Sequence, residues 1–183
     1  TTLSSVIRVT VAEDMSEESD PAEWDAAGFA AWAKTNFGAE LTAEEIRSRG
    51  GEAAVVPGDV GERATADALV AAAVDGFGGL DVVVNNAGVT RDRMLFNMSD
   101  EEWDQVVRIH LRGHFLLSRN AAAYWRAKAK ESGPVGAAVV NTASEAFLSG
   151  PPGQANYAAA KAGIAALTVS TARALGSSGV RAN

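Results

Sequence analysis

"LDVVVNNAG", residues 80–88, is the stretch that decides how this chain folds. A short apolar run that ends in two amides and a glycine is typical of a strand buried on both faces of a sheet. Comparable runs occur in "EAAVVPGDV", residues 52–60, and in "VGAAVVNTAS", residues 135–144. Helical patterns separate the three runs. This alternation predicts an α/β fold with a parallel sheet covered by helices on both sides, in three α/β/α layers.

The helical segments have clear boundaries. "LTAEEIRSRGG", residues 41–51, and "ERATADALVAAAVDGFGG", residues 62–79, both end on glycine pairs, which stop helices. Ser99 precedes three acidic residues in a capping-box arrangement and predicts a long helix over 99–130. An alanine-rich pattern predicts a further helix over 155–176.

Composition narrows the functional classes. The chain has 183 residues, 47% of them hydrophobic, which fits one globular domain over 1–183. Its formal charge of -7 disfavours nucleic acid and anionic membranes as partners. Because the sequence contains no cysteine, catalysis by a thiol and metal binding by thiolates are excluded. With no signal-peptide or membrane-span pattern, we expect a cytoplasmic protein.

Polar residues or glycine follow each predicted strand. The three strand ends read Pro57–Val60, Asn85–Gly88 and Asn141–Ser144. In parallel sheets, ligands bind beyond the carboxyl ends of the strands. Because these three polar segments are expected at the same edge of the sheet, they predict a binding cleft there. Each has a structural alternative, because Asp59 could cap a helix, the asparagines could tie loops, and Ser144 could start a turn.

Tyr157 and Lys161 stand four residues apart in "GQANYAAAKAGIAAL", residues 153–167. Side chains at this helical spacing are neighbours. An ammonium group beside a phenol favours the phenolate, so the pair could act as a general acid and base. A surface pair with no chemistry is the alternative.

These residues together resemble the short-chain dehydrogenase/reductase family. The resemblance runs from about Leu41 to the end and rests on "NNAG" at 85–88, on "YAAAK" at 157–161, and on a serine thirteen residues before the tyrosine. It implies a Rossmann-like, doubly wound sheet and an oxidoreductase that interconverts a secondary alcohol and a ketone with NAD or NADP. The implied catalytic residues are Ser144, Tyr157, Lys161 and His110. The implied cofactor-binding residues are Asp59, Val60, Asn86, Ala87, Gly88, Ile109, Tyr157 and Lys161.

His110 stands where most members of the family carry a catalytic asparagine. The "HLRG" at 110–113 and the Arg91–Arg93 triplet resemble the (3R)-hydroxyacyl-CoA dehydrogenase subgroup, which implies a 3-hydroxyacyl or 3-oxoacyl thioester as substrate. Alternatives are a reductase of fatty-acid synthesis, a steroid or other alcohol dehydrogenase, and a catalytically silent scaffold. His110 and His114 have metal-ligand spacing but lack a third ligand, so we expect no metal site and a packing role for His114.

The sequence departs from the family at both ends. No glycine-rich phosphate-binding turn occurs before Leu41, and the chain stops at "GVRAN", so the fold is expected to be incomplete: it lacks the first strand with that turn and the C-terminal strands. Residues 6–12 could form a strand, after which Glu13 or Asp14 would favour NAD over NADP. Residues 13–40 are expected to be an acidic insertion, irregular or helical. The resemblance also implies a homodimer or homotetramer formed through the 99–130 and 155–176 helices.

Overall fold

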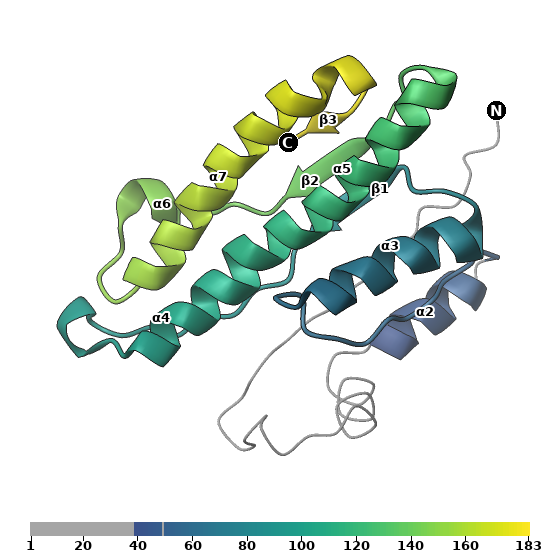
Figure 1. Cartoon of the computed structure of the whole chain (residues 1–183). Coiled ribbons are helices and arrows are strands. Elements are labelled where there is room, and N and C mark those ends of the chain that lie inside the picture. The colour runs from purple at the N-terminus through teal and green to yellow at the C-terminus, as the bar shows by residue number, and fades with distance from the viewer. Residues whose placement is uncertain (1–38, 49) are drawn as a thin grey trace.

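The computed structural model describes residues 39–48 and 50–183, and Figure 1 shows the arrangement of the chain. Its helices, helical turns and strands are, in chain order, α2 (Ala39–Ser48), α3 (Arg63–Phe77), β1 (Val82–Asn85), η2 (Leu95–Asn97), α4 (Asp100–Val107), η3 (Arg108–Arg112), α5 (Gly113–Ser132), β2 (Ala138–Asn141), α6 (Ala146–Ser149), α7 (Ala155–Leu175), η4 (Gly176–Ser178) and β3 (Arg181–Ala182). The predicted strand at residues 6–12, Glu13, Asp14 and most of the predicted insertion lie outside the described residues. Residues 39 and 40 of that insertion belong to α2.

The sheet of the described residues has three parallel strands in the order β1-β2-β3. Val83 pairs with Val139, and Val139 pairs with Ala182. The parallel sheet and the incomplete α/β fold predicted from the sequence are therefore confirmed. The short β3 was not predicted; it forms because the Arg181 N–H donates to the carbonyl of Ala137, just before β2, and the Asn183 N–H donates to the carbonyl of Val139 in β2, both at 2.9 Å.

The strand predicted within residues 52–60 is wrong: this segment carries no strand. A strand needs a neighbour to pair its backbone groups, and the free edge of β1 has no partner among the described residues. The Ala53 carbonyl instead accepts a 2.8 Å hydrogen bond from the Arg47 guanidinium, and the segment ends in a turn at Asp59.

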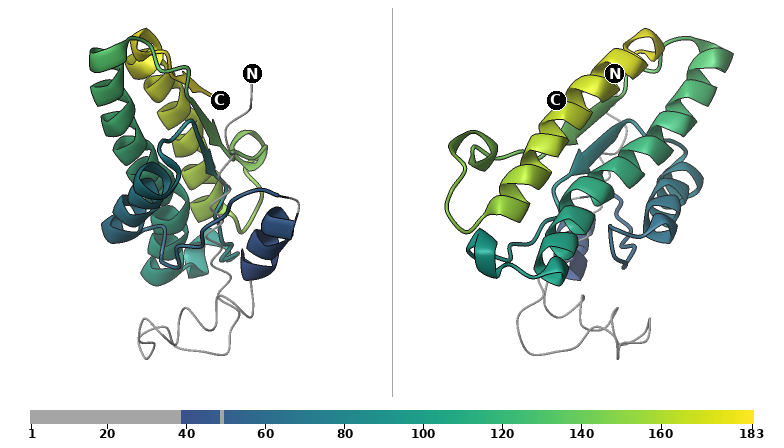
Figure 2. Two further views of the ribbon diagram at one scale, coloured as in Figure 1. Left: turned by 90° about the vertical axis from the view of Figure 1, so that its right-hand side faces the viewer. Right: turned by 60° about the vertical axis from the view of Figure 1, so that its left-hand side comes forward.

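Helices α5 and α7 cover one face of the sheet (Figure 2). The core between them includes Trp125, which is fully buried and whose indole N–H donates to the Leu80 carbonyl at 2.6 Å. Val83 on β1 and Val139 on β2 point into this core. Because a large aromatic side chain on α5 meets both strands, the long helix is held firmly against the sheet.

The opposite face of the sheet is open at several apolar residues. Val82, Val84 and Val140 are 40%, 53% and 40% exposed. The prediction that β1 is buried on both faces is therefore wrong for this face. Figure 2 shows α2 on that side of the sheet, so three layers are present only in part.

One long helix runs from α4 through η3 into α5, as predicted. Ser99 Oγ accepts from the Glu102 N–H at 3.2 Å, and a Glu102 carboxylate oxygen accepts from the Ser99 N–H at 2.9 Å, which confirms the capping box. Residues 108–112 form a π-helical turn within this helix. Such turns are frequent at functional sites because they re-aim side chains, and this one carries His110.

None of the helices in the described segments has both the length and the apolarity needed to cross a membrane.

Candidate active site

The carboxyl ends of β1 and β2 meet the first turns of α7. Lys161 on α7 donates from Nζ to the Thr142 carbonyl at 2.6 Å, directly after β2. The Thr142 hydroxyl donates to the Asn86 side-chain oxygen at 3.0 Å, directly after β1. Two of the three predicted strand ends thus lie together beside the Tyr157 helix, whereas residues 57–60 follow no strand.

A row of hydrogen-bonded amides and hydroxyls lies below these strand ends; Asn85 and Ser118 are buried, and Asn141 and Thr168 are half-buried. The Asn85 amide donates to Ser118 Oγ at 3.0 Å and to the Asn141 side-chain oxygen at 2.8 Å. The Asn141 amide donates in turn to Thr168 Oγ1 at 2.8 Å. The row ties α5, β1, β2 and α7 together, so it fixes the strand ends relative to both helices. Buried polar groups that are satisfied in this way specify one arrangement.

Lys161 is buried to 2% exposure beside Tyr157. Its Nζ lies 5.3 Å from the centre of the Tyr157 ring and is hydrogen-bonded to Thr142. Burial lowers the pKa of the Lys161 ammonium below its usual value, because desolvation disfavours the charged form. Lys161 therefore presents a positive charge at the face of the tyrosine ring, fixed by a backbone carbonyl.

His110 is buried, and its Nε2 meets both backbone polar groups of Val89. Nε2 lies 3.1 Å from the Val89 nitrogen and 2.7 Å from its carbonyl oxygen. Burial, with a smaller contribution from the charge of Lys161, lowers the pKa of His110 to about 4, although the bond to Val89 opposes the shift. The imidazole is thus neutral near pH 7. The partner of His110 Nε2 is thus the backbone of Val89 and not the backbone of its own helix.

His114 lies one turn further along the same helix. It is 2% exposed, and burial lowers its pKa to about 4, with smaller contributions from the charges of Lys161 and His110. The expected packing role fits this burial. In the described part of the chain, no three His, Asp or Glu side chains come together as a metal site requires.

Ser144 is half-buried at the start of α6. Its Oγ accepts a hydrogen bond from the Ala146 N–H at 3.2 Å, so it does begin a turn. Accepting this bond leaves the hydroxyl proton for donation to another oxygen. The structure thus places Ser144 on the loop that connects β2 to α7 without joining it to Tyr157 by a hydrogen bond.

Asp59 and Val60 lie against the helix that carries His110. The Asp59 carboxylate accepts from the Gly61 N–H at 2.7 Å and forms an ion pair with Arg108. Val60 packs in an apolar cluster that includes Ile109. Ile109 is fully buried, so its side chain supports the site by packing.

The residues after β1 differ in exposure. Asn86 and Gly88 are exposed and Ala87 is half-buried. A Cβ atom on Gly88 would lie 2.1 Å from His110 Cε1. Glycine at position 88 therefore gives the imidazole the room to reach the Val89 backbone.

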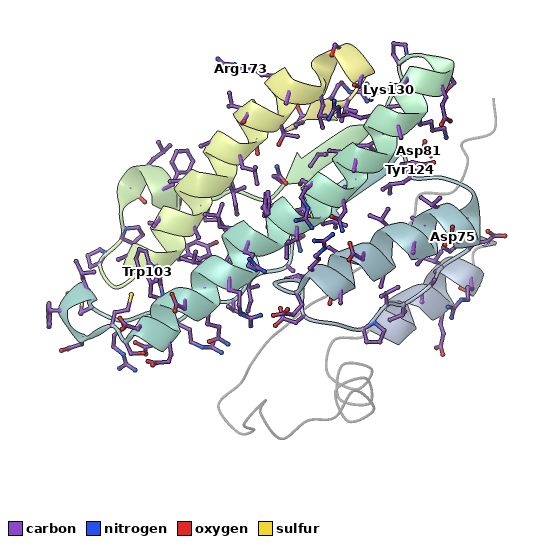
Figure 3. The ribbon with its side chains drawn as sticks, viewed as in Figure 1. Asp75, Asp81, Trp103, Tyr124, Lys130 and Arg173 are labelled. Carbon is purple, nitrogen blue, oxygen red and sulfur yellow. The ribbon has the colours of Figure 1, made fainter. Side chains whose placement is uncertain are left out.

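A shallow groove of about 680 Å³ lies elsewhere, between the C-terminal halves of α5 and α7. Its lining includes alanines and the basic residues Arg119, Arg126 and Lys130. Figure 3 shows Lys130 and Arg173 at the end of these helices far from Trp103 on α4. The groove is remote from Tyr157 and holds no acid–base pair. We therefore assign the active site from its side chains and not from the presence of a groove.

Two residues of the site were missed from the sequence. Thr142 supplies the carbonyl that holds Lys161, and Asn156 is completely buried next to Tyr157. A backbone carbonyl leaves no trace in a sequence pattern. An asparagine in the first turn of a helix reads as an ordinary cap, which hides its long-range contacts.

Comparison with known proteins agrees with this geometry. The short chain dehydrogenase family matches residues 22–183, and the chain belongs to this family. A hydroxyacyl-CoA dehydrogenase, ChsB1, of Mycobacterium tuberculosis is 71% identical over 136 residues, which cover 73% of this chain and 43% of that protein. A 3-oxoacyl-[acyl-carrier-protein] reductase, FabG, of Staphylococcus aureus is 39% identical over 145 residues, 79% of this chain and 56% of that protein.

The fold has solved relatives. A crystal structure of a short chain dehydrogenase from Mycobacterium avium superposes with a TM-score of 0.77 at 49% identity, over 79% of this chain and 50% of that one. The chain spans about half the length of the curated relatives it matches.

Proposed function

We propose that the protein is an oxidoreductase that interconverts a secondary alcohol and a ketone with a nicotinamide dinucleotide, acting on a 3-hydroxyacyl or 3-oxoacyl thioester. The observation that carries this proposal is the position of Tyr157 between a buried lysine and a buried histidine at the carboxyl edge of the sheet. In the reducing direction the carbonyl oxygen of the substrate gains negative charge and needs hydrogen-bond donors.

Tyr157 is the proton donor in that direction and the base in the reverse direction. Its hydroxyl is the acid of the cluster, and the side chain is half-buried, so substrate can reach it. Ser144 donates its remaining hydroxyl proton to the same substrate oxygen. Two donors aimed at one developing charge stabilise it more than one.

Lys161 and His110 hold Tyr157 and its surroundings in place. The Lys161 ammonium lies over the Tyr157 ring, 5.3 Å from its centre. His110, neutral because its pKa is about 4, fixes the Val89 backbone beside the strand end. A neutral imidazole accepts or donates a hydrogen bond at Val89 without adding a second positive charge next to Lys161.

The described residues fit part of a nicotinamide dinucleotide. Asn86, Ala87 and Gly88 present amide and backbone groups for a ribose, and Lys161 has two further protons to donate after its bond to Thr142. We propose that Asp59 and Val60 hold the adenine end, as the family resemblance implies, whereas the described residues contain no glycine-rich turn for the pyrophosphate. A bound nicotinamide supplies the two electrons of the reduction. We propose NAD as the preferred form.

The substrate class is inferred from the relatives. ChsB1 is named a hydroxyacyl-CoA dehydrogenase and FabG a 3-oxoacyl-[acyl-carrier-protein] reductase. Both names describe the same bond change on a thioester, and the relative with 71% identity acts on the CoA form by its name. We therefore assign an acyl-CoA rather than a steroid or a simple alcohol.

The protein is proposed to assemble as a homodimer or homotetramer through the α4–α5 and α7 helices. Trp103 on α4, Phe115 on α5 and Val169 on α7 are 38%, 41% and 52% exposed. Exposed apolar side chains on two neighbouring helices are suited to association with a second copy. A cytoplasmic location stays a prediction from the sequence.

A direct assay tests the function. The complete gene product is mixed with acetoacetyl-CoA and NADH, and the absorbance of the reduced cofactor is followed at saturating substrate. We expect steady oxidation of NADH, slower with NADPH, and reversal with 3-hydroxybutyryl-CoA and NAD. Cofactor binding without turnover of any 3-oxoacyl thioester would point to another alcohol, and neither binding nor turnover would point to a silent scaffold.

A further inference from the structure

Asn156 is the residue immediately before Tyr157, and its side chain joins three separate segments of the chain. The side-chain amide donates to the Arg91 carbonyl at 3.0 Å and to the Glu102 carbonyl at 3.1 Å. The side-chain oxygen accepts from the Tyr157 backbone N–H at 2.7 Å. Asn156 has no exposed surface.

The orientation of this amide is fixed by its partners. A reversed amide would set its oxygen against two carbonyl oxygens and its NH2 group against an N–H. Every hydrogen-bonding direction except one lone pair of the amide oxygen is used. A buried amide satisfied to this extent is costly to replace, because each buried group left unpaired destabilises the fold.

The segments that Asn156 joins surround the active site. Arg91 lies in the loop between β1 and η2, Glu102 lies in the first turn of α4, and Tyr157 lies in the first turn of α7. The first-turn N–H groups of a helix have no partner within the helix, so the Asn156 oxygen supplies one for Tyr157. The same contact zone contains a hydrogen bond of 2.8 Å from the Arg93 N–H to the Gly153 carbonyl.

We propose that Asn156 is a positioning residue for Tyr157, which locks the register of the phenol-bearing turn of α7 against the loop after β1 and the start of α4. In this role it touches neither substrate nor cofactor. Its contribution is to hold the Tyr157 hydroxyl at one place relative to the strand ends, where displacements of about 1 Å can cost about 100-fold in rate. The catalytic part of this inference rests on the function proposed above.

Two substitutions separate the parts of the contact. Asn156→Asp keeps the oxygen that accepts from Tyr157 but removes both donors to Arg91 and Glu102. Asn156→Leu has a similar size and removes all three hydrogen bonds. Asn97→Asp, on an exposed residue of η2, is the control for the added carboxylate.

We expect both Asn156 variants of the complete gene product to lose kcat about 10- to 100-fold, while the KM for the cofactor stays within about twofold. Thermal unfolding verifies that the molecules assayed are folded. Asn97→Asp should match the wild type. A kcat within twofold of wild type in both variants would overturn the proposal, as would a loss of cofactor affinity that parallels the loss of kcat.

Amide hydrogen exchange tests the same contacts without any turnover. In Asn156→Leu, the Tyr157 and Arg93 amides should exchange faster; in Asn156→Asp, Arg93 should exchange faster while Tyr157 stays protected. Unchanged exchange at both amides in Asn156→Leu would overturn the proposal even if activity falls. If the wild type proves inactive while exchange responds as expected, the proposed function fails and the structural role of Asn156 stands.

Discussion

The rings of His110 and Tyr157 lie 5.1 Å apart and nearly perpendicular, at 86°. One of these residues is the acid of the site, and the other stands where most family members have asparagine. The imidazole therefore both packs against the tyrosine and holds the Val89 backbone. An asparagine could perform the second task but not the first, because it has no ring.

Gly88→Ala should displace His110, because the new Cβ would lie 2.1 Å from Cε1 of the imidazole. We expect a lower melting temperature and a loss of turnover. Gly76→Ala is the matched control: Gly76 lies within α3 with nothing near its Cβ position, so alanine there should stabilise the protein by about 0.5–1 kcal/mol. Equal melting temperatures and rates for the two variants would contradict the close packing of Gly88 on His110.

His110→Asn should retain most of the activity, because a carboxamide can donate to the Val89 carbonyl and accept from the Val89 N–H at the same time. His110→Leu should lose it, since the Val89 backbone group that pairs with Nε2 would be left unpaired, at a cost of about 1–3 kcal/mol. Rates per folded molecule measured across pH 6–9 compare the three proteins. Superimposable profiles for all three would remove His110 from the mechanism.

Stability should fall in mild acid. Burial holds the pKa of His110 and of His114 at about 4, against an ordinary value of 6.5. Between these values the unfolded chain binds protons that the folded protein does not, so this stabilisation is complete above pH 6.5 and is lost as the pH falls through 4. The loss is on the order of 3 kcal/mol per histidine. Chemical unfolding at several pH values measures it, and His110→Asn should flatten the slope.

Lys161→Ala should weaken turnover and cofactor binding together, because the ammonium serves both Tyr157 and the proposed ribose site. Loss of the bond from Lys161 also leaves the half-buried Thr142 carbonyl without this partner. Cofactor titration by fluorescence, alongside steady-state rates, separates the two effects. Unchanged cofactor affinity would restrict Lys161 to an electrostatic role at Tyr157.

The sequence predicts much of the fold because its signals are local. Each of these signals lies within a single element: the capping box at Ser99, the periodicity of the long helices, and the apolar run at 82–84. Residues 52–60 have the same local pattern but form no strand, because pairing depends on a neighbour far away in the sequence. The exposure of Val82 and Val84 has a similar explanation. Whether a strand face is buried depends on which other segments pack against it, and the sequence of the strand alone does not contain this information.

The site was predictable where side chains carry the chemistry. Tyr157, Lys161 and His110 come together as the spacing and the family resemblance imply. Backbone partners such as the Thr142 carbonyl and the Val89 amide were not predictable, since any residue supplies them. Asn156 falls between the two cases, because its side chain is specific but its partners are carbonyls of Arg91 and Glu102.

Tyr157→Phe tests the central claim most directly, because it removes one hydroxyl and keeps the ring that packs against His110 and faces Lys161. Turnover of acetoacetyl-CoA and fluorescence titration with NADH are measured on the same preparation of the complete gene product. The account predicts that turnover is abolished while cofactor affinity stays close to wild type. Activity retained within tenfold of wild type would contradict the assignment of Tyr157 as the acid of an alcohol–ketone oxidoreductase.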